Sequence, residues 1–183
     1  MARLPYLNPS DLAPENKDLL ARNINLFRAL VHSPNGARAF HGLGGYIRNK
    51  SRLDPRLREL AILQVGWLAR SPYEFSHHVK IGRDFGVSDA DIRAMIEESE
   101  GQASSLEPLA KAVLRAAREM TSEMAVSDAT FAELRAGLDP ERLTDLVITI
   151  SFYNAVIRLL ATLQIDVEED YMKYLEEFPW PGA

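Results

Sequence analysis

Pairs of a helix-capping residue and a proline recur along this chain, and they constrain its fold more than any other feature. An Asp or Ser side chain can accept a hydrogen bond from the first turn of a helix. Proline suits the first helical position, because its missing N–H would have no helical partner there. The pairs are Ser33-Pro34, Asp54-Pro55, Ser71-Pro72 and Asp139-Pro140. Each precedes apolar residues at helical spacing, so these segments are predicted to be helices.

Helical periodicity covers most of the chain, and no segment alternates as a strand does for long. We expect helices over residues 15–31, 34–49, 55–69, 72–85, 88–98, 105–124, 128–137, 140–165 and 166–177. Between two of them, Gly86 can end one helix in the left-handed conformation, and Ser88 can cap the next. The sequence therefore predicts an all-α fold, as a single domain over 1–183.

Composition sets limits on the chemistry. The 183 residues, 46% of them hydrophobic, suffice for one full core. The 21 basic and 26 acidic residues give a net charge of -5, which argues against a broad cationic face for nucleic acid. Cysteine is absent, which excludes disulfides, thiolate metal sites and cysteine nucleophiles.

Two apolar regions bear on localisation. The N-terminus carries no apolar run of signal-peptide length, so a cytoplasmic protein without membrane contact is expected. The stretch 146–163 has nearly the length of a membrane span, but it contains Arg158, and a charge in mid-bilayer is costly. We expect this helix to be buried in a soluble protein.

Glu59 lies inside the helix expected at 55–69, which is apolar almost all round. It shares a helical stripe with Leu63 and Gly66, so its carboxylate could face a packed or concave surface. The alternative is a partly exposed first-turn acid, stabilised by the helix dipole.

A second group of polar residues opens the next helix. Ser71, Glu74 and His78 fall at positions i, i+3 and i+7 on one helical face. A carboxylate four residues before an imidazole can hold and charge it, as general acid–base chemistry requires. Ser-x-x-Glu is also a capping box, in which both side chains only satisfy backbone N–H groups. The two roles are compatible.

His77 and Glu74 form one Glu-x-x-His pair, the unit that di-iron helical bundles use twice. No second copy occurs, because neither His32 nor His41 follows an acid at that spacing. We therefore expect no metal.

Together these residues resemble a known family. Glu59, then Ser71-x-x-Glu74-x-x-x-His78, followed by Gly82-Arg83 and 85–88, is similar to the core of the carboxymuconolactone decarboxylase and alkylhydroperoxidase D-like superfamily. The resemblance extends over about 40–165. It implies an orthogonal helical bundle with a core at 40–125, completed by a buried helix at 139–165.

The two branches of that family differ in chemistry. In the peroxidase branch a Cys-x-x-Cys pair works with the glutamate and histidine, whereas this chain has Ser71 and Glu74 at the cysteine positions, so that chemistry is lost. The decarboxylase branch has Tyr-Glu, an aromatic residue, two residues and His. The segment Tyr73-Glu74-Phe75-Ser76-His77-His78 matches it more closely, although Phe75 stands where tryptophan is usual.

The resemblance implies a lyase without a cofactor, acting on a carboxylated lactone or a related small acid. Loss of CO₂ then needs stabilisation of an enolate-like centre and delivery of a proton. His78 is expected to donate the proton, Glu74 to orient and charge His78, and Glu59 to act as a second relay acid.

The expected substrate is an anion, and Arg binds carboxylates better than Lys does. Arg158, within the apolar helix, is the candidate for this role, with Ser71, Tyr73 and Asn154 as further substrate-binding residues. The alternative for Arg158 is a structural ion pair with Glu59 or Asp145. Arg83 is expected to be solvated.

Two other functional classes stay open at this point. The chain could be a peroxidase-related family member without redox cysteines that binds a small ligand or uses non-thiol chemistry. It could also be a metal-dependent oxygenase on a helical bundle.

Apolar helices of this kind are difficult to cover within one small chain, so a homo-oligomer is expected, and the family resemblance implies a trimer or hexamer. The C-terminal segment Phe178-Pro-Trp180-Pro-Gly-Ala is expected to pack on a neighbouring copy.

Overall fold

A computed structural model describes residues 2–178, and it contains helices and no strand within that range. Two short 3₁₀ helices, η1 (Pro9–Asp11) and η2 (Pro14–Leu20), precede the α-helices. The α-helices are α1 (Asn25–Leu30), α2 (Pro34–Asn49), α3 (Pro55–Leu68), α4 (Pro72–Asp84), α5 (Asp89–Ser99), α6 (Pro108–Ser122), α7 (Asp128–Gly137), α8 (Pro140–Leu163) and α9 (Glu169–Glu176). The all-α prediction is confirmed.

The predicted helix starts are confirmed at each capping residue followed by proline. Asp54, Ser71 and Asp139 accept hydrogen bonds from the backbone N–H three residues later, whereas Ser33 precedes its helix without a side-chain cap. Gly86 has a φ of 93°, in the left-handed region, and Ser88 caps α5. Local capping chemistry thus sets these boundaries.

The helix predicted over 15–31 is wrong in one respect, because the chain breaks between η2 and α1. Tertiary hydrogen bonds hold the start of α1 in place. The N–H of Asn25 donates to Glu168 Oε1 at 2.6 Å, and the N–H of Leu26 donates to the Tyr73 hydroxyl at 3.2 Å. The break brings Arg22 and Ile24 to the wall of a pocket.

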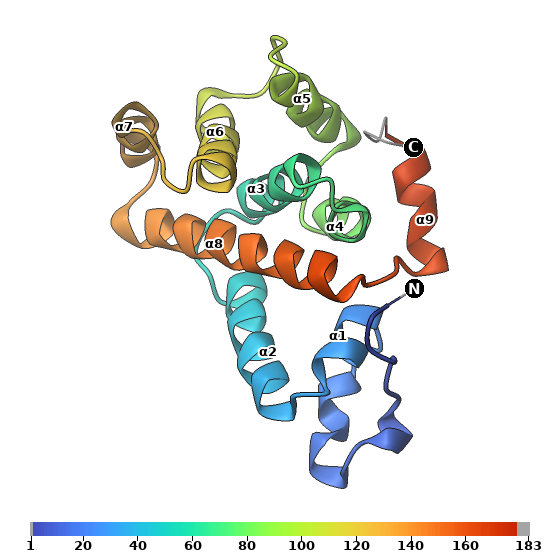
Figure 1. Ribbon diagram of the computed structural model, residues 1–183. Coiled ribbons are helices and arrows are strands. Elements are labelled where there is room, and N and C mark those ends of the chain that lie inside the picture. Colours follow the sequence, from blue (N-terminus) through green and yellow to red (C-terminus); the bar gives the residue numbers. More distant parts are fainter. Residues whose placement is uncertain (1, 179–183) are drawn as a thin grey trace.

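Helix α3 is the centre of the molecule, with α4, α5, α6 and α8 packed around it (Figure 1). Every residue from Leu57 to Trp67 is buried, as its nearly continuous apolar sequence predicts. A central helix of this kind can present a polar side chain only to a neighbouring helix or to an internal pocket, never directly to bulk water.

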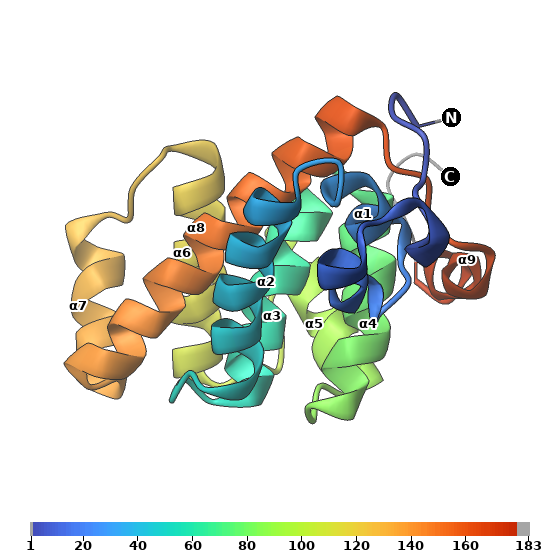
Figure 2. The ribbon, with the colours of Figure 1, turned by 90° about the horizontal axis from the view of Figure 1, so that it is seen from below.

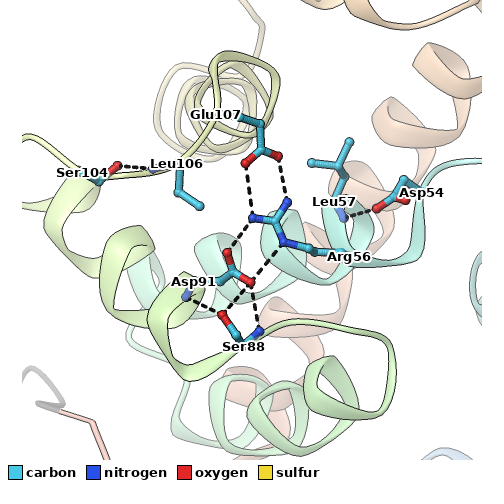
Figure 3. A network of polar contacts seen from close by, with 8 residues as sticks. All are labelled: Asp54, Arg56, Leu57, Ser88, Asp91, Ser104, Leu106 and Glu107. Carbon is cyan, nitrogen blue, oxygen red and sulfur yellow. Dashed lines mark hydrogen bonds and ion pairs between the residues drawn. The ribbon is translucent and has the colours of Figure 1, made fainter.

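An arginine network ties the start of α3 to α5 and α6. Arg56 donates to Asp91 through Nε (3.0 Å) and to Glu107 through Nη1 (2.7 Å) (Figure 3). Asp91 also accepts from the backbone N–H of Ser88, at the cap of α5. These contacts fix the N-terminal end of the central helix.

Helix α8 crosses α3 and α6 and lies beside α2 (Figure 2). Its apolar sequence is long enough to cross a membrane by length and composition, and 44% of its most apolar window is buried in the fold. The expectation of a buried helix is therefore only half correct, because one face is exposed. Val147, Ser151, Ala155 and Arg158 follow one another along that face. The predicted homo-oligomer stays a prediction.

Helix α2 is attached to α8 through a buried carboxylate. Asp145 accepts hydrogen bonds from the hydroxyls of Tyr46 (2.6 Å) and Ser51 (2.8 Å) and from the N–H of Arg52 (2.8 Å). This anchor fixes the C-terminal end of α2.

The C-terminal α9 packs on α4. Phe178 is buried against Phe75, with ring centroids 6.3 Å apart, so within this chain it packs on its own core. The rest of the predicted C-terminal arm, 179–183, lies outside the described residues.

Candidate active site

A buried glutamate and a buried histidine meet between α3 and α4. His78 Nδ1 donates a hydrogen bond of 2.6 Å to Glu59 Oε2, and both side chains are at most 5% exposed. Gly66 permits the close approach of the two helices, because a Cβ there would lie 3.2 Å from the backbone nitrogen of Phe75. The prediction that the Glu59 carboxylate faces a packed surface is confirmed, and the alternative of a partly exposed acid is wrong.

Glu74 contacts the other nitrogen of the same imidazole. His78 Nε2 lies 2.9 Å from Glu74 Oε1, one helical turn away. The Ser71 hydroxyl accepts from the N–H of Glu74, but the N–H of Ser71 donates to the Gly66 carbonyl and not to Glu74. Only half of the capping box forms, so the Glu74 carboxylate is available to His78. His78 is thus held between two carboxylates.

Arg58 completes the buried chain of charges. Its Nε donates to Glu59 Oε1 at 3.0 Å, and its guanidinium lies 4.5 Å from the ring centre of Phe85. The Arg58 side chain is only 2% exposed. Two carboxylates and two potential cations therefore alternate as Arg58, Glu59, His78 and Glu74, and such alternation makes buried charge tolerable.

These neighbours change the protonation of the central pair. Burial acts to lower the pKa of His78, but the charges of Glu59 and Glu74 outweigh burial and raise that pKa above its ordinary value. Burial acts to raise the pKa of Glu59, but His78 and Arg58 outweigh it and hold that pKa below its ordinary value. The favoured state is an imidazolium beside a carboxylate.

A pocket of about 230 Å³ opens beside this chain of charges. Glu74 and His78 line it, whereas Glu59 and Arg58 lie behind them and do not. Tyr153 also lines it, and its ring packs edge-on to His78 with centroids 5.0 Å apart. Burial, together with Glu74 and Glu59, raises the pKa of Tyr153, so its hydroxyl stays protonated. The pocket thus holds a proton donor, a carboxylate and a neutral phenol.

The other walls of the pocket are aromatic and cationic. Phe27, Phe40 and Phe152 supply apolar surface. Arg48 lines the pocket and acts to lower the pKa of the Tyr153 hydroxyl, and Arg22 lines the pocket from the break before α1. Within residues 2–178, no carboxylate forms an ion pair with either guanidinium. The pocket is suited to an anion with an apolar ring.

The sequence indicated Arg158 as the arginine that binds the substrate, whereas the structure places Arg48 in the pocket wall. Arg158 lies on the exposed face of α8, where its Nη1 donates to the carbonyl and side-chain oxygens of Asn154. Neither Glu59 nor Asp145 pairs with it, so the alternative of a structural ion pair is wrong, and Arg158 is not part of the pocket wall. The signal for Arg48 was weak, because it is one of several basic residues near the end of a helix.

The remaining predicted substrate-binding residues separate into two groups. Tyr73 lines the pocket, and its hydroxyl donates to Glu168 Oε1 at 3.1 Å. Ser71 and Asn154 are not part of the pocket wall. Ser71 caps α4, and Asn154 donates to Thr121 Oγ1 at 3.0 Å.

The second histidine of α4 has different partners. His77 Nδ1 lies 2.9 Å from the Tyr73 carbonyl, and its Nε2 lies 3.1 Å from Glu168 Oε2. Its ring is stacked between Tyr73 and Tyr171. His77 therefore joins α4 to α9, and it forms no pair with Glu74. No group of three His, Asp or Glu side chains arranged to hold a metal occurs in residues 2–178.

Comparison with known proteins agrees with this fold. Residues 34–119 match the sequence model of the carboxymuconolactone decarboxylase family. A solved structure of an uncharacterized peroxidase-related protein from Ralstonia eutropha, an alkylhydroperoxidase AhpD core, superposes on this chain with a TM-score of 0.77 and 20% sequence identity. The superposition covers 93% of this chain and 94% of that chain. A search of curated proteins found no match.

Two further solved structures share the fold. A cysteine-to-alanine variant of the debrominase Bmp8, in complex with 2,3,4-tribromopyrrole, has a TM-score of 0.80 at 18% identity, with 97% of this chain and 99% of that chain covered. A peroxidase-related protein from Silicibacter has a TM-score of 0.71 at 17% identity, with 92% of each chain covered.

The chain is therefore an all-helical protein with a buried Glu–His–Glu site beside a small pocket. Its residues 34–119 match the carboxymuconolactone decarboxylase family, and the chain shares the fold of alkylhydroperoxidase D-like proteins.

Proposed function

We propose that this protein is a lyase that removes CO₂ from a small carboxylated acid, such as a carboxylated lactone, by proton transfer from the Glu74–His78 pair. The observation that carries the proposal is the position of that pair. Both side chains line the pocket, and Glu59 holds the imidazole from behind at 2.6 Å. An acid–base unit needs this combination of a fixed ring and access to the substrate.

The roles proposed for the two glutamates follow from their positions, and they reverse those expected from sequence. Glu59 does not reach the pocket, so it positions His78 and stabilises its charged form. Glu74 lines the pocket beside Nε2, where it can return a proton to the imidazole after each cycle. His78 remains the proposed donor.

In the proposed reaction the substrate loses CO₂ and takes up one proton in its place. The bond between the substrate and its carboxylate carbon breaks, CO₂ leaves, and the electron pair passes into the adjoining conjugated carbonyl as an enolate. The neutral Tyr153 hydroxyl stabilises the enolate oxygen, and Arg48 binds a carboxylate of the substrate. His78 then gives its proton to carbon, and water supplies a replacement proton through Glu74. Because the chain has no cysteine, a thiolate reaction on this scaffold lacks its nucleophile.

The test is CO₂ release from 4-carboxymuconolactone by the purified protein in EDTA. We expect turnover by the wild type and a loss on the order of 10²-fold in kcat for Glu74→Gln, which keeps the size of the side chain and removes its basicity. His32→Gln is the control, because His32 is exposed and is not part of the pocket wall. No release by the wild type, or equal rates in Glu74→Gln, would contradict the proposal and favour ligand binding without turnover.

A further inference from the structure

One face of α2 forms a continuous wall of the pocket. His41, Gly44, Gly45 and Arg48 all line it, at positions i, i+3, i+4 and i+7 of the helix. Residues at this spacing share one side of an α-helix. The proposed chemistry uses only Arg48 among them, so the rest of this α2 face has no role in it.

The two glycines make this face flat. A Cβ at Gly45 would have no other atom within 4 Å, and a Cβ at Gly44 would meet only the ring of Phe152, at 3.7 Å. Neither glycine is required by packing or by a left-handed backbone, because both lie in regular helix. Glycine inside a helix costs about 1 kcal/mol relative to alanine. Open space beside Gly45 is what a ligand ring lying against α2 needs.

A polar side chain lies at each end of this face. Arg48 has no carboxylate partner within residues 2–178. At the other end, the imidazole of His41 packs on Phe27, with ring centroids 4.1 Å apart, and its buried Nε2 has no hydrogen-bond partner. A buried polar atom without a partner is destabilising, so each such atom needs an explanation.

The two ends differ in charge. Burial lowers the pKa of His41, so its ring is neutral near pH 7, whereas Arg48 is always charged. The two residues are seven positions apart, or ~10 Å along the helix axis. A ligand that satisfies both ends therefore carries its anionic group at one end and a neutral oxygen at the other.

We propose that this α2 face is a binding site for a ring-bearing monocarboxylic acid. Arg48 binds the carboxylate, the ring lies against Gly44 and Gly45, and His41 hydrogen-bonds to a hydroxyl or carbonyl oxygen at the far end of the ring. The inference rests on the proposed function only in taking the same pocket as the substrate site. Phe27 from α1 and Phe152 from α8 line the same pocket and offer apolar surface to the ring.

Binding of two matched acids tests the role of His41. Isothermal titration calorimetry would compare 4-hydroxybenzoate with 4-methylbenzoate, which is similar in size but forms no hydrogen bond at that end. We expect the wild type to bind 4-hydroxybenzoate about tenfold more tightly. His41→Phe should abolish this preference while leaving 4-methylbenzoate unaffected, and His41→Gln should restore part of it. Equal affinities in the wild type, or no binding of either acid, would overturn the proposal.

A pair of glycine variants tests the position of the ring. Gly42 and Gly45 both lie in α2 with open space beyond their Cα, but only Gly45 lines the pocket. Gly45→Leu should weaken the binding of both acids on the order of tenfold or more, because leucine fills the space for the ring. Gly42→Leu should bind as the wild type does. Equal binding by the two variants would place the ring elsewhere.

These results are independent of catalysis, because calorimetry measures binding without turnover. Binding of the acids without CO₂ release from 4-carboxymuconolactone would contradict the lyase and leave the α2 face in place. Turnover of the lactone with no difference between the glycine variants would contradict the α2 face alone. Circular dichroism of each variant confirms that it is folded.

Discussion

For the proposed lyase reaction, we expect His78→Gln to lower kcat for CO₂ release by about 10²–10⁴-fold, the range for loss of a general acid. Glutamine retains hydrogen-bonding groups but has no proton to give near neutral pH. The same change leaves Glu74 buried without its cationic partner, so we also expect lower stability. Steady-state kinetics and urea denaturation measure the two effects.

A double variant separates chemistry from folding. Glu74→Gln together with His78→Gln removes the unpaired charge as well as the proton donor. We expect its free energy of unfolding to recover most of the loss seen in His78→Gln, while its turnover stays low. Recovery of turnover along with stability would mean that His78 is a structural residue.

Glu59→Gln destabilises the protein by about 3–5 kcal/mol, the cost of removing one partner from a buried charged network. Glu59 is 1% exposed and contacts both His78 and Arg58. Its neutral replacement leaves the Arg58 guanidinium without its carboxylate. Urea denaturation near neutral pH measures the loss, and a change under 1 kcal/mol would contradict this account of the network.

The pH dependence of stability gives a second readout of the same variant. The folded-state pKa of Glu59 is lowered, so its contribution is present above the unfolded value near 4.5 and is lost as the pH falls through the lowered pKa. The folded-state pKa of His78 is raised, so its contribution is present below the unfolded value near 6.5 and is lost as the pH rises through the raised pKa. We expect Glu59→Gln to flatten both limbs of the wild-type profile.

The helices could be predicted because their starts are set locally. Asp54, Ser71 and Asp139 cap helices through atoms three residues away, and Gly86 ends one through its own φ. Such contacts are visible in a short window of sequence. The break before α1 was not, because it depends on Glu168, which is more than 140 residues further along the chain.

The site was predictable in part. Helical spacing placed Glu74 beside His78, and the family resemblance added Glu59 from the neighbouring helix. The burial expected for Arg158 is wrong, because an apolar helix such as α8 does not reveal which of its faces the neighbouring helices cover. Arg158 lies on the exposed face of α8. Arg48 lines the pocket because α2, which carries it, is attached to α8 through Asp145.

The most direct test of the central claim is the titration of His78 by ¹⁵N-detected NMR, with its signals assigned by comparison with His78→Gln. If the imidazole is the charged proton donor held between Glu59 and Glu74, both ring nitrogens carry protons, and its pKa lies above 6.5. In Glu59→Gln that pKa should fall. A wild-type His78 that titrates below 6.5, as burial alone would dictate, would contradict the account.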